Sequence, residues 1–102
     1  MIGLNLMEDS LLILIKMDRL QEIKYREMRE VLNHLPLMGV SVPEIAETVH
    51  LSVSTIYSYR RGYLPTETKY RMIMSKLRTK YPFEVAAAIE IIKKEDEVLG
   101  VN

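Results

Sequence analysis

The chain contains no cysteine and no tryptophan, and its only histidines are His34 and His50. Without cysteine, the protein can form neither a disulfide framework nor a cysteine-ligated zinc site. Two histidines 16 residues apart do not by themselves make a metal site, and both are better explained as structural or solvated side chains. We therefore expect a protein that binds no metal and no cofactor.

Long apolar segments are also missing. No uninterrupted apolar run is longer than the five residues of Leu11–Ile15, far fewer than the about 20 residues that a membrane-spanning helix needs. Glu8 and Asp9 precede this run, where a secretory signal would carry basic residues. We expect a protein that makes no membrane contact and lies in the cytoplasm, or in the host cytoplasm if a virus or plasmid encodes it.

Motifs typical of enzymes do not occur in the sequence. There is no glycine-rich phosphate loop, no Ser/His/Asp or Cys/His combination, and no carboxylate pair in a defined environment. The acidic run Glu95-Asp96-Glu97 has the character of a solvated helix end. We therefore expect a binding protein rather than a catalyst.

Charge is balanced over the whole chain but unevenly distributed along it. Residues 1–50 carry eight acidic and five basic side chains, and residues 82–102 carry five acidic and two basic ones. Residues 51–81 carry seven basic side chains and one acidic side chain, Glu67, for a net charge of +6. A polyanion would be attracted to this middle block, although a charged stretch of this kind is often only a solvated helix face.

Proline, glycine and capping side chains divide the chain into five helices joined by short loops. Pro36 and Gly39 stop the first helix, and Ser41-Val-Pro-Glu44 forms a capping box that starts the second. Ser52 and Thr66 are typical N-cap residues for the third and fourth helices. This pattern predicts an all-α fold, a compact bundle of about five helices in one domain over residues 1–102. The predicted helices run from residue 9 or 10 to 35 and over residues 41–49, 52–61, 66–80 and 82–98.

Residues 4–20 are ambiguous, because Leu11–Ile15 is apolar at every position and fits a strand as well as a helix. The good helix formers that follow favour a helix. A chain of this size would struggle to cover such a run alone, so the segment is a candidate oligomerisation element, and burial within the monomer is the alternative. On the first interpretation the protein is a homodimer.

Apolar residues recur at helical spacing in each predicted helix, which identifies the candidate core. The last helix is apolar over most of its length, and we expect its large side chains to be mostly buried. The predicted inward positions are Ile23, Met28, Val31, Leu32, Leu35, Ile45, Ala46, Val49, Ile56, Tyr59, Tyr70, Ile73, Met74, Leu77, Phe83, Ala86, Ala87, Ile89, Ile91 and Ile92.

Residues 42–61 have the spacing of a helix-turn-helix motif. Ala46 supplies the small residue that lets the second helix cross closely over the first. His50 stands at the turn, where the backbone is left-handed and glycine is usual, so we expect about 1 kcal/mol of local strain. The apolar positions that such a motif needs are occupied by Ile45, Val49, Leu51, Ile56 and Tyr59.

This segment resembles the helix-turn-helix of regulators of the Cro/lambda-repressor type, and the resemblance covers residues 22–81. It is specific at Ala46, over Ser52–Tyr59, and at Gly62 and Pro65, which match the glycine and proline that precede the next helix in those proteins. Ser54-Thr-Ile-Tyr-Ser-Tyr59 is also similar to the DNA-binding tail of the Hin/resolvase recombinases. The resemblance implies a compact helical domain that places its second motif helix in the major groove of DNA.

The exposed positions of the helix over residues 52–61 suit base recognition. Val53 can pack on a thymine methyl group, and Ser54 and Ser58 can hydrogen-bond base edges. Arg61 can reach a guanine or a phosphate, and Tyr57 a phosphate or the sugar wall. Partial packing at the edge of the domain is the alternative role for Tyr57. The predicted base contacts are Val53, Ser54, Tyr57, Ser58 and Arg61, and the predicted backbone contacts are Arg60, Tyr63, Lys69 and Arg71.

These features predict a sequence-specific DNA-binding protein, a transcriptional regulator whose partner is double-stranded DNA. A second pattern suggests an alternative. Glu22-Ile-Lys-Tyr-Arg26 and Glu67-Thr-Lys-Tyr-Arg71 share four of five residues, so residues 20–50 and 66–98 are either two similar helix pairs or alike by chance. A groove between two such pairs would fit a peptide or a partner helix, and the protein would then be an interaction module that does not bind DNA.

Overall fold

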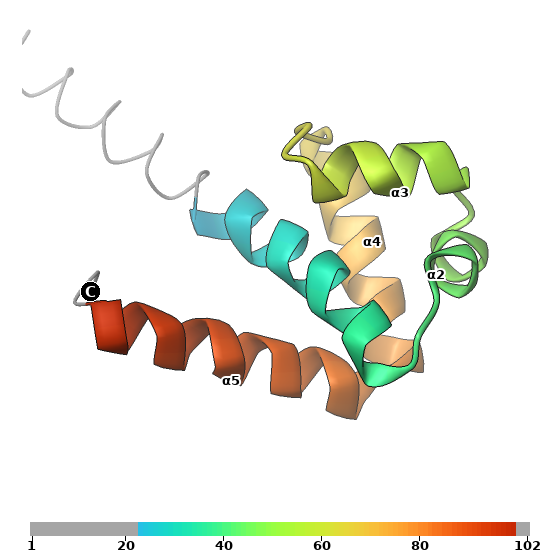
Figure 1. Cartoon of the computed structure of the whole chain (residues 1–102). Coiled ribbons are helices and arrows are strands. Elements are labelled where there is room, and N and C mark those ends of the chain that lie inside the picture. Colours follow the sequence, from blue (N-terminus) through green and yellow to red (C-terminus); the bar gives the residue numbers. More distant parts are fainter. Residues whose placement is uncertain (1–22, 100–102) are drawn as a thin grey trace, which may run out of the picture.

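A computed structural model describes residues 23–99 of the chain, and over this range the structure has five α-helices and no strand. The all-α fold class is therefore confirmed (Figure 1). The first described helix covers residues 23–34, and residues 4–20, with their predicted oligomerisation element, lie outside the described range. It is followed by the short 3-10 helix η1 (Leu35–Met38), α2 (Val42–Val49), α3 (Val53–Arg60), α4 (Glu67–Lys80) and α5 (Pro82–Leu99).

Side-chain caps begin the three middle helices at the predicted residues. The hydroxyl oxygens of Ser41, Ser52 and Thr66 each accept a hydrogen bond from the backbone N–H three residues later. These bonds satisfy amide groups that have no partner within the helix. At Ser41 only this half of the predicted capping box forms, since the Glu44 carboxylate makes no return hydrogen bond to the Ser41 N–H.

Three of the helical segments are followed by a residue with a left-handed backbone conformation. Gly39 (φ 91°), His50 (φ 55°) and Gly62 (φ 107°) each follow a helical segment. At His50 the N–H donates to the Glu47 carbonyl, and the next N–H donates to the Ala46 carbonyl, which is the Schellman pattern. The prediction of a left-handed backbone at His50 is confirmed, and it is the one described non-glycine residue with positive φ.

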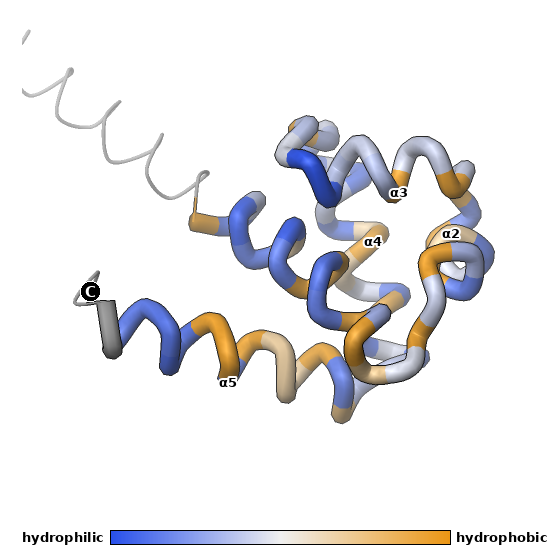
Figure 2. The backbone as a smooth tube through the Cα atoms, viewed as in Figure 1, coloured by the Kyte–Doolittle hydropathy of each residue, from blue (hydrophilic) through white to orange (hydrophobic). Residues whose placement is uncertain are grey.

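One hydrophobic core joins the helices, with α4 packed against both α2 and α5. The helix over residues 23–34 lies between α3 and α5 (Figure 1). Asn33 bonds it to Arg60 at the end of α3, and Arg26 bonds it to Asp96 of α5 at 2.6 Å. Figure 2 shows the apolar positions gathered along the inner sides of the helices. The buried apolar residues are Met28, Val31, Leu32, Leu35, Val40, Val42, Ile45, Ala46, Val49, Ile56, Tyr59, Ile73, Met74, Leu77, Val85, Ala88 and Ile92.

The buried face of α5 differs from the prediction. Phe83 is 83% exposed, Ala86 and Ala87 are exposed, and Ile91 is also on the solvent side. The helix packs through Val85, Ala88 and Ile92, with Ile89 half-buried, a stripe at spacings of three and four. Only one face of a helix at the edge of the bundle meets the core, so Phe83, Ala86, Ala87 and Ile91 stay in solvent. Ile23, at the start of the described chain, is likewise exposed rather than inward.

The two helix pairs of the suggested repeat are alike only in their first helices. Tyr25 and Tyr70 occupy equivalent positions in the two similar segments, and their rings pack edge to face with centroids 5.5 Å apart. The second helices differ, because α2 has 8 residues and α5 has 18. The connections differ as well, since η1 precedes α2 whereas Tyr81 alone separates α4 from α5.

Candidate nucleic-acid interface

The α2–turn–α3 unit forms as the helix-turn-helix spacing predicts. Ala46 is buried at the point where the two helices pack, and a larger side chain there would push them apart. Ile56 and Tyr59 are the only buried residues of α3, and both face inward. Because α2 also packs on α4, the unit is held by the core while α3 lies at the end of the molecule away from α5 (Figure 1).

The outer face of α3 carries most of the predicted base-contacting residues. Val53, Tyr57 and Arg61 follow one another at spacings of four and are all exposed, Val53 by 39% and Tyr57 by 45%. Ser54 is exposed beside them, and Ser58 is half-buried, with its hydroxyl donating to the Ser54 carbonyl at 3.1 Å. In Figure 2 this helix is pale along most of its length, because serine, threonine and tyrosine are neither strongly polar nor strongly apolar. The structure therefore brings these five side chains to one side of one helix.

Arg60 is fixed by a neighbour that sequence reasoning did not find. Its Nε donates to Asn33 Oδ1 at 2.8 Å, and Asn33 Nδ2 donates to the Arg60 carbonyl at 3.4 Å. Its guanidinium carbon lies 5.5 Å from the centroid of the Tyr57 ring, within the range of a cation–π contact. Asn33 lies 27 residues earlier in the chain, and no local pattern links the two positions.

Arg29 also reaches the end of α3. Its Nη1 lies 3.6 Å from the position that a Cβ on Gly62 would occupy, so the guanidinium rests beside the turn that ends α3. Arg29 and Asn33 are four residues apart and share one face of their helix. Arg29 lies 33 residues before Gly62 in the chain, so only the fold brings the two residues close together.

The other predicted backbone contacts lie on more than one surface. Tyr63 is 72% exposed in the loop after α3. Lys69 and Arg71 are both exposed on α4, but two residues correspond to about 200° around a helix, so they occupy opposite flanks. The structure therefore does not bring Arg71 together with Lys69.

Glu67 sits between the basic side chains at the start of α4. Arg71 Nε donates to Glu67 Oε1 at 2.9 Å, and Lys24 donates to the same carboxylate. The hydrogen bond from Lys24, reinforced by Arg71, lowers the pKa of the Glu67 carboxyl below its ordinary value. The one acidic residue of the basic block thus forms ion pairs with two cations, Lys24 and Arg71, and partly offsets their charge.

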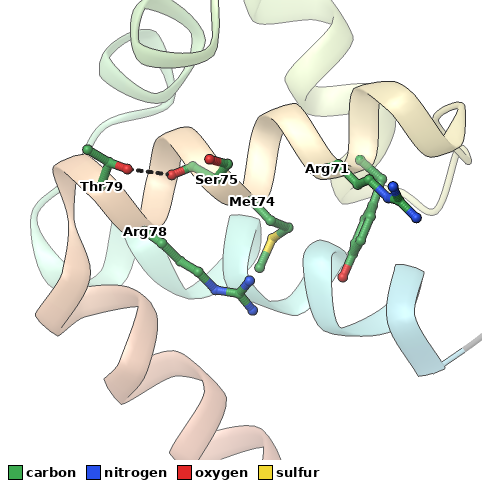
Figure 3. Close-up of a pocket in the computed structure, with 6 residues that line it drawn as sticks. Arg71, Met74, Ser75, Arg78 and Thr79 are labelled. Carbon is green, nitrogen blue, oxygen red and sulfur yellow. Dashed lines mark hydrogen bonds between the residues drawn. The ribbon is translucent and has the colours of Figure 1, made fainter.

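A shallow depression of about 390 Å³ lies along the flank of α4 that bears Arg71 and Arg78 (Figure 3). All six lining residues belong to α4, with Met74 at the floor and Ser75 and Thr79 at the edge. Between the two helix pairs of the alternative interpretation, the first helices are in contact: Tyr25 packs on Tyr70, and Lys24 binds Glu67.

Within residues 23–99, no group of three or more His, Cys, Asp or Glu side chains is placed to hold a metal ion. None of the helices described there is long and apolar enough to cross a membrane. Comparison of the chain with protein-family models, with curated proteins and with solved structures finds no match.

Proposed function

We propose that this protein binds double-stranded DNA by inserting α3 into the major groove and acts in the cytoplasm as a sequence-specific transcriptional regulator. The observation that carries the proposal is the outer face of α3, which is exposed and ends in Arg60 and Arg61. From Leu51 to Thr66 the chain has no acidic residue. The surface offered to a groove is therefore neutral and hydrogen-bonding at its centre and basic at one end.

The dimensions of α3 suit this role. An α-helix with its side chains is about 10–12 Å across, and the major groove of B-DNA is about 12 Å wide. Ser54 and Ser58 hydrogen-bond base edges, and Val53 packs against a thymine methyl group. Arg61, in the turn after the helix, contacts a guanine or the adjoining phosphate.

Phosphate contacts fix the orientation of the helix. Arg60 and Tyr63 supply them at the end of α3, and Lys69 extends the contact along the strand. Arg71, on the opposite flank of α4, contributes through long-range attraction rather than through the same phosphate. Glu44 and Glu47 are exposed on α2, and their charge keeps the phosphate chain away from that helix.

A dimer is part of the proposal. One α3 covers only a few base pairs, and two-fold symmetric regulators gain specificity by placing two recognition helices about one turn of DNA apart. We propose that the homodimer forms through residues 4–20, which lie outside the described part of the structure.

The test begins with selection of bound sites from a random duplex library. Affinity for the selected duplex is then measured by fluorescence anisotropy for the wild type, for Arg61→Ala and for the control Lys94→Ala, which removes an exposed charge from α5. Loss of a base contact costs about 1–3 kcal/mol, so Arg61→Ala should weaken binding roughly 5- to 150-fold, and Lys94→Ala should leave it unchanged. Enrichment of no sequence, or equal effects of the two variants, would contradict the proposal.

The helical interaction module stays the alternative, and salt separates it from DNA binding. Each phosphate contact adds about −0.9 to the slope of log affinity against log salt concentration. A peptide-binding protein would bind no duplex, and Arg61→Ala would not change its affinity for the peptide. The peptide bound by such a module would then be sought in a peptide library.

A further inference from the structure

We propose that the helix over residues 23–34 completes a phosphate-binding site at the end of α3, with Arg29 as a ligand and Asn33 as the residue that positions Arg60. The ligand is a phosphodiester oxygen of the DNA backbone. This inference rests on the proposed function and extends it to a second element of the fold. It assigns roles to two residues that the helix-turn-helix pattern does not contain.

The first step concerns which hydrogen-bond donors of Arg60 are already used. Its Nε is used by Asn33 Oδ1 at 2.8 Å, and Asn33 Nδ2 returns a bond to the Arg60 carbonyl. No described residue accepts a hydrogen bond from Arg60 Nη1 or Nη2. The guanidinium is thus held at its inner edge and over the Tyr57 ring, while its two terminal NH₂ groups stay available. Two adjacent N–H donors in one plane match the oxygens of a phosphate.

The second step is preorganisation. A free arginine side chain loses much rotamer freedom when it is immobilised on a ligand, and this loss opposes binding. Asn33 imposes most of that order before DNA arrives. Asparagine is neutral, so it restrains Arg60 without cancelling its charge, which an aspartate at the same position would do.

The third step concerns the charged side chains near Arg60. Arg29 Nη1 lies beside Gly62, and Arg60 and Arg61 are the two residues before Gly62, so three arginines flank the turn that ends α3. One carboxylate faces this cluster, Glu30, whose oxygen is 3.5 Å from Arg29 Nε. With one carboxylate against three arginines, a net excess of positive charge remains around this turn, and it favours the binding of an anion.

The experiment compares the salt dependence of duplex binding for Asn33→Asp, Arg60→Ala, their combination and the control Ser75→Asp. The control adds the same charge at an exposed position on α4. Loss of one phosphate contact should make the slope shallower by about 0.9, so raising salt from about 50 to 200 mM should weaken Asn33→Asp about 3.5-fold less than the wild type. Arg60→Ala should show the same change, the combination no further change, and Ser75→Asp none.

Thermal unfolding accompanies these titrations. Asn33→Asp keeps an acceptor for Arg60 Nε but loses the Nδ2 donor to the Arg60 carbonyl, so its melting temperature should change. A purely structural role for Asn33 predicts that change in stability with an unaltered salt slope, whereas the proposed role predicts a shallower slope as well. Arg29→Gln is an independent test, because it should make the slope of log affinity against log salt concentration shallower while Asn33 is unchanged. Wild-type slopes in both Asn33→Asp and Arg29→Gln would overturn the inference. Absence of duplex binding by the wild type would instead overturn the proposed function.

Discussion

Replacement of His50 by glycine should stabilise the protein. His50 adopts φ 55° and ψ 43°, a left-handed conformation that costs an L-residue roughly 1–2 kcal/mol because its Cβ crowds the backbone. The imidazole is exposed and makes no hydrogen bond within the described residues, so its removal loses no contact. Glycine relieves the strain but makes the unfolded chain more flexible, at a cost of about 0.4–1 kcal/mol. The expected net gain is about 0.5–1 kcal/mol.

The assay is urea and thermal unfolding followed by circular dichroism. For a domain of this size, 1 kcal/mol corresponds to about 4–8 °C, so His50→Gly should melt roughly 2–8 °C higher than the wild type. Gly62→Ala is the matched control, since φ at Gly62 is 107° and an alanine there should destabilise the fold. His50→Ala should resemble the wild type, because alanine carries the same Cβ. A lower melting temperature for His50→Gly, or equal gains for the glycine and alanine variants, would refute the reasoning.

Four further substitutions give distinct readouts. Ser58→Ala should raise the free energy of unfolding by about 0.5 kcal/mol, because alanine is the better helix former, yet weaken binding to the selected duplex. The hydrogen bond from Lys24 lowers the pKa of Glu67, so this pair stabilises the fold above the ordinary glutamate pKa. Its contribution is lost as the pH falls through the lowered pKa. Glu67→Gln should therefore flatten the decline of melting temperature below about pH 4.3. Val85→Ala should cost about 2 kcal/mol in urea unfolding and Phe83→Ala less than about 0.5 kcal/mol, in line with their burial.

Local chemistry was enough to predict where most helices begin and end. Ser41, Ser52 and Thr66 act as caps in the structure because a hydroxyl at these positions satisfies amides that the helix itself cannot. The left-handed turn at His50 was predictable for a related reason, since the spacing of apolar residues on either side leaves one residue to reverse the chain. Signals of this kind act over three or four residues and do not depend on the rest of the fold.

The buried face of α5 could not be predicted in the same way. From Val85 to Ile92 the helix is apolar on nearly every side, interrupted only by Glu90, so hydrophobic periodicity does not select a face. The choice is made by the neighbours, α4 and η1, which cover one side and leave Phe83 in solvent. Such a face depends on how many partners a helix has, which is a property of the whole bundle.

In the candidate site, some positions follow from local sequence patterns and others depend on how the helices pack. The outer positions of α3 follow from the motif spacing, because Ile56 and Tyr59 must point inward and Val53, Tyr57 and Arg61 then point out. The contributions of Arg29 and Asn33 depend on how the helix over residues 23–34 docks against α3. Contacts between residues 27 positions apart leave no periodic trace in a single sequence.

The composition of α3 itself points to selection for something other than folding. Val53-Ser-Thr-Ile-Tyr-Ser-Tyr-Arg60 contains no alanine, leucine, glutamate or lysine, and its β-branched, hydroxyl and aromatic residues are mediocre helix formers. Only Ile56 and Tyr59 of its eight residues are buried. The helix is therefore stabilised from outside, by the Ser52 cap, by α2 and by the Asn33–Arg60 pair. Local preference and final structure disagree in this helix, and such conflict is expected where residues serve a ligand.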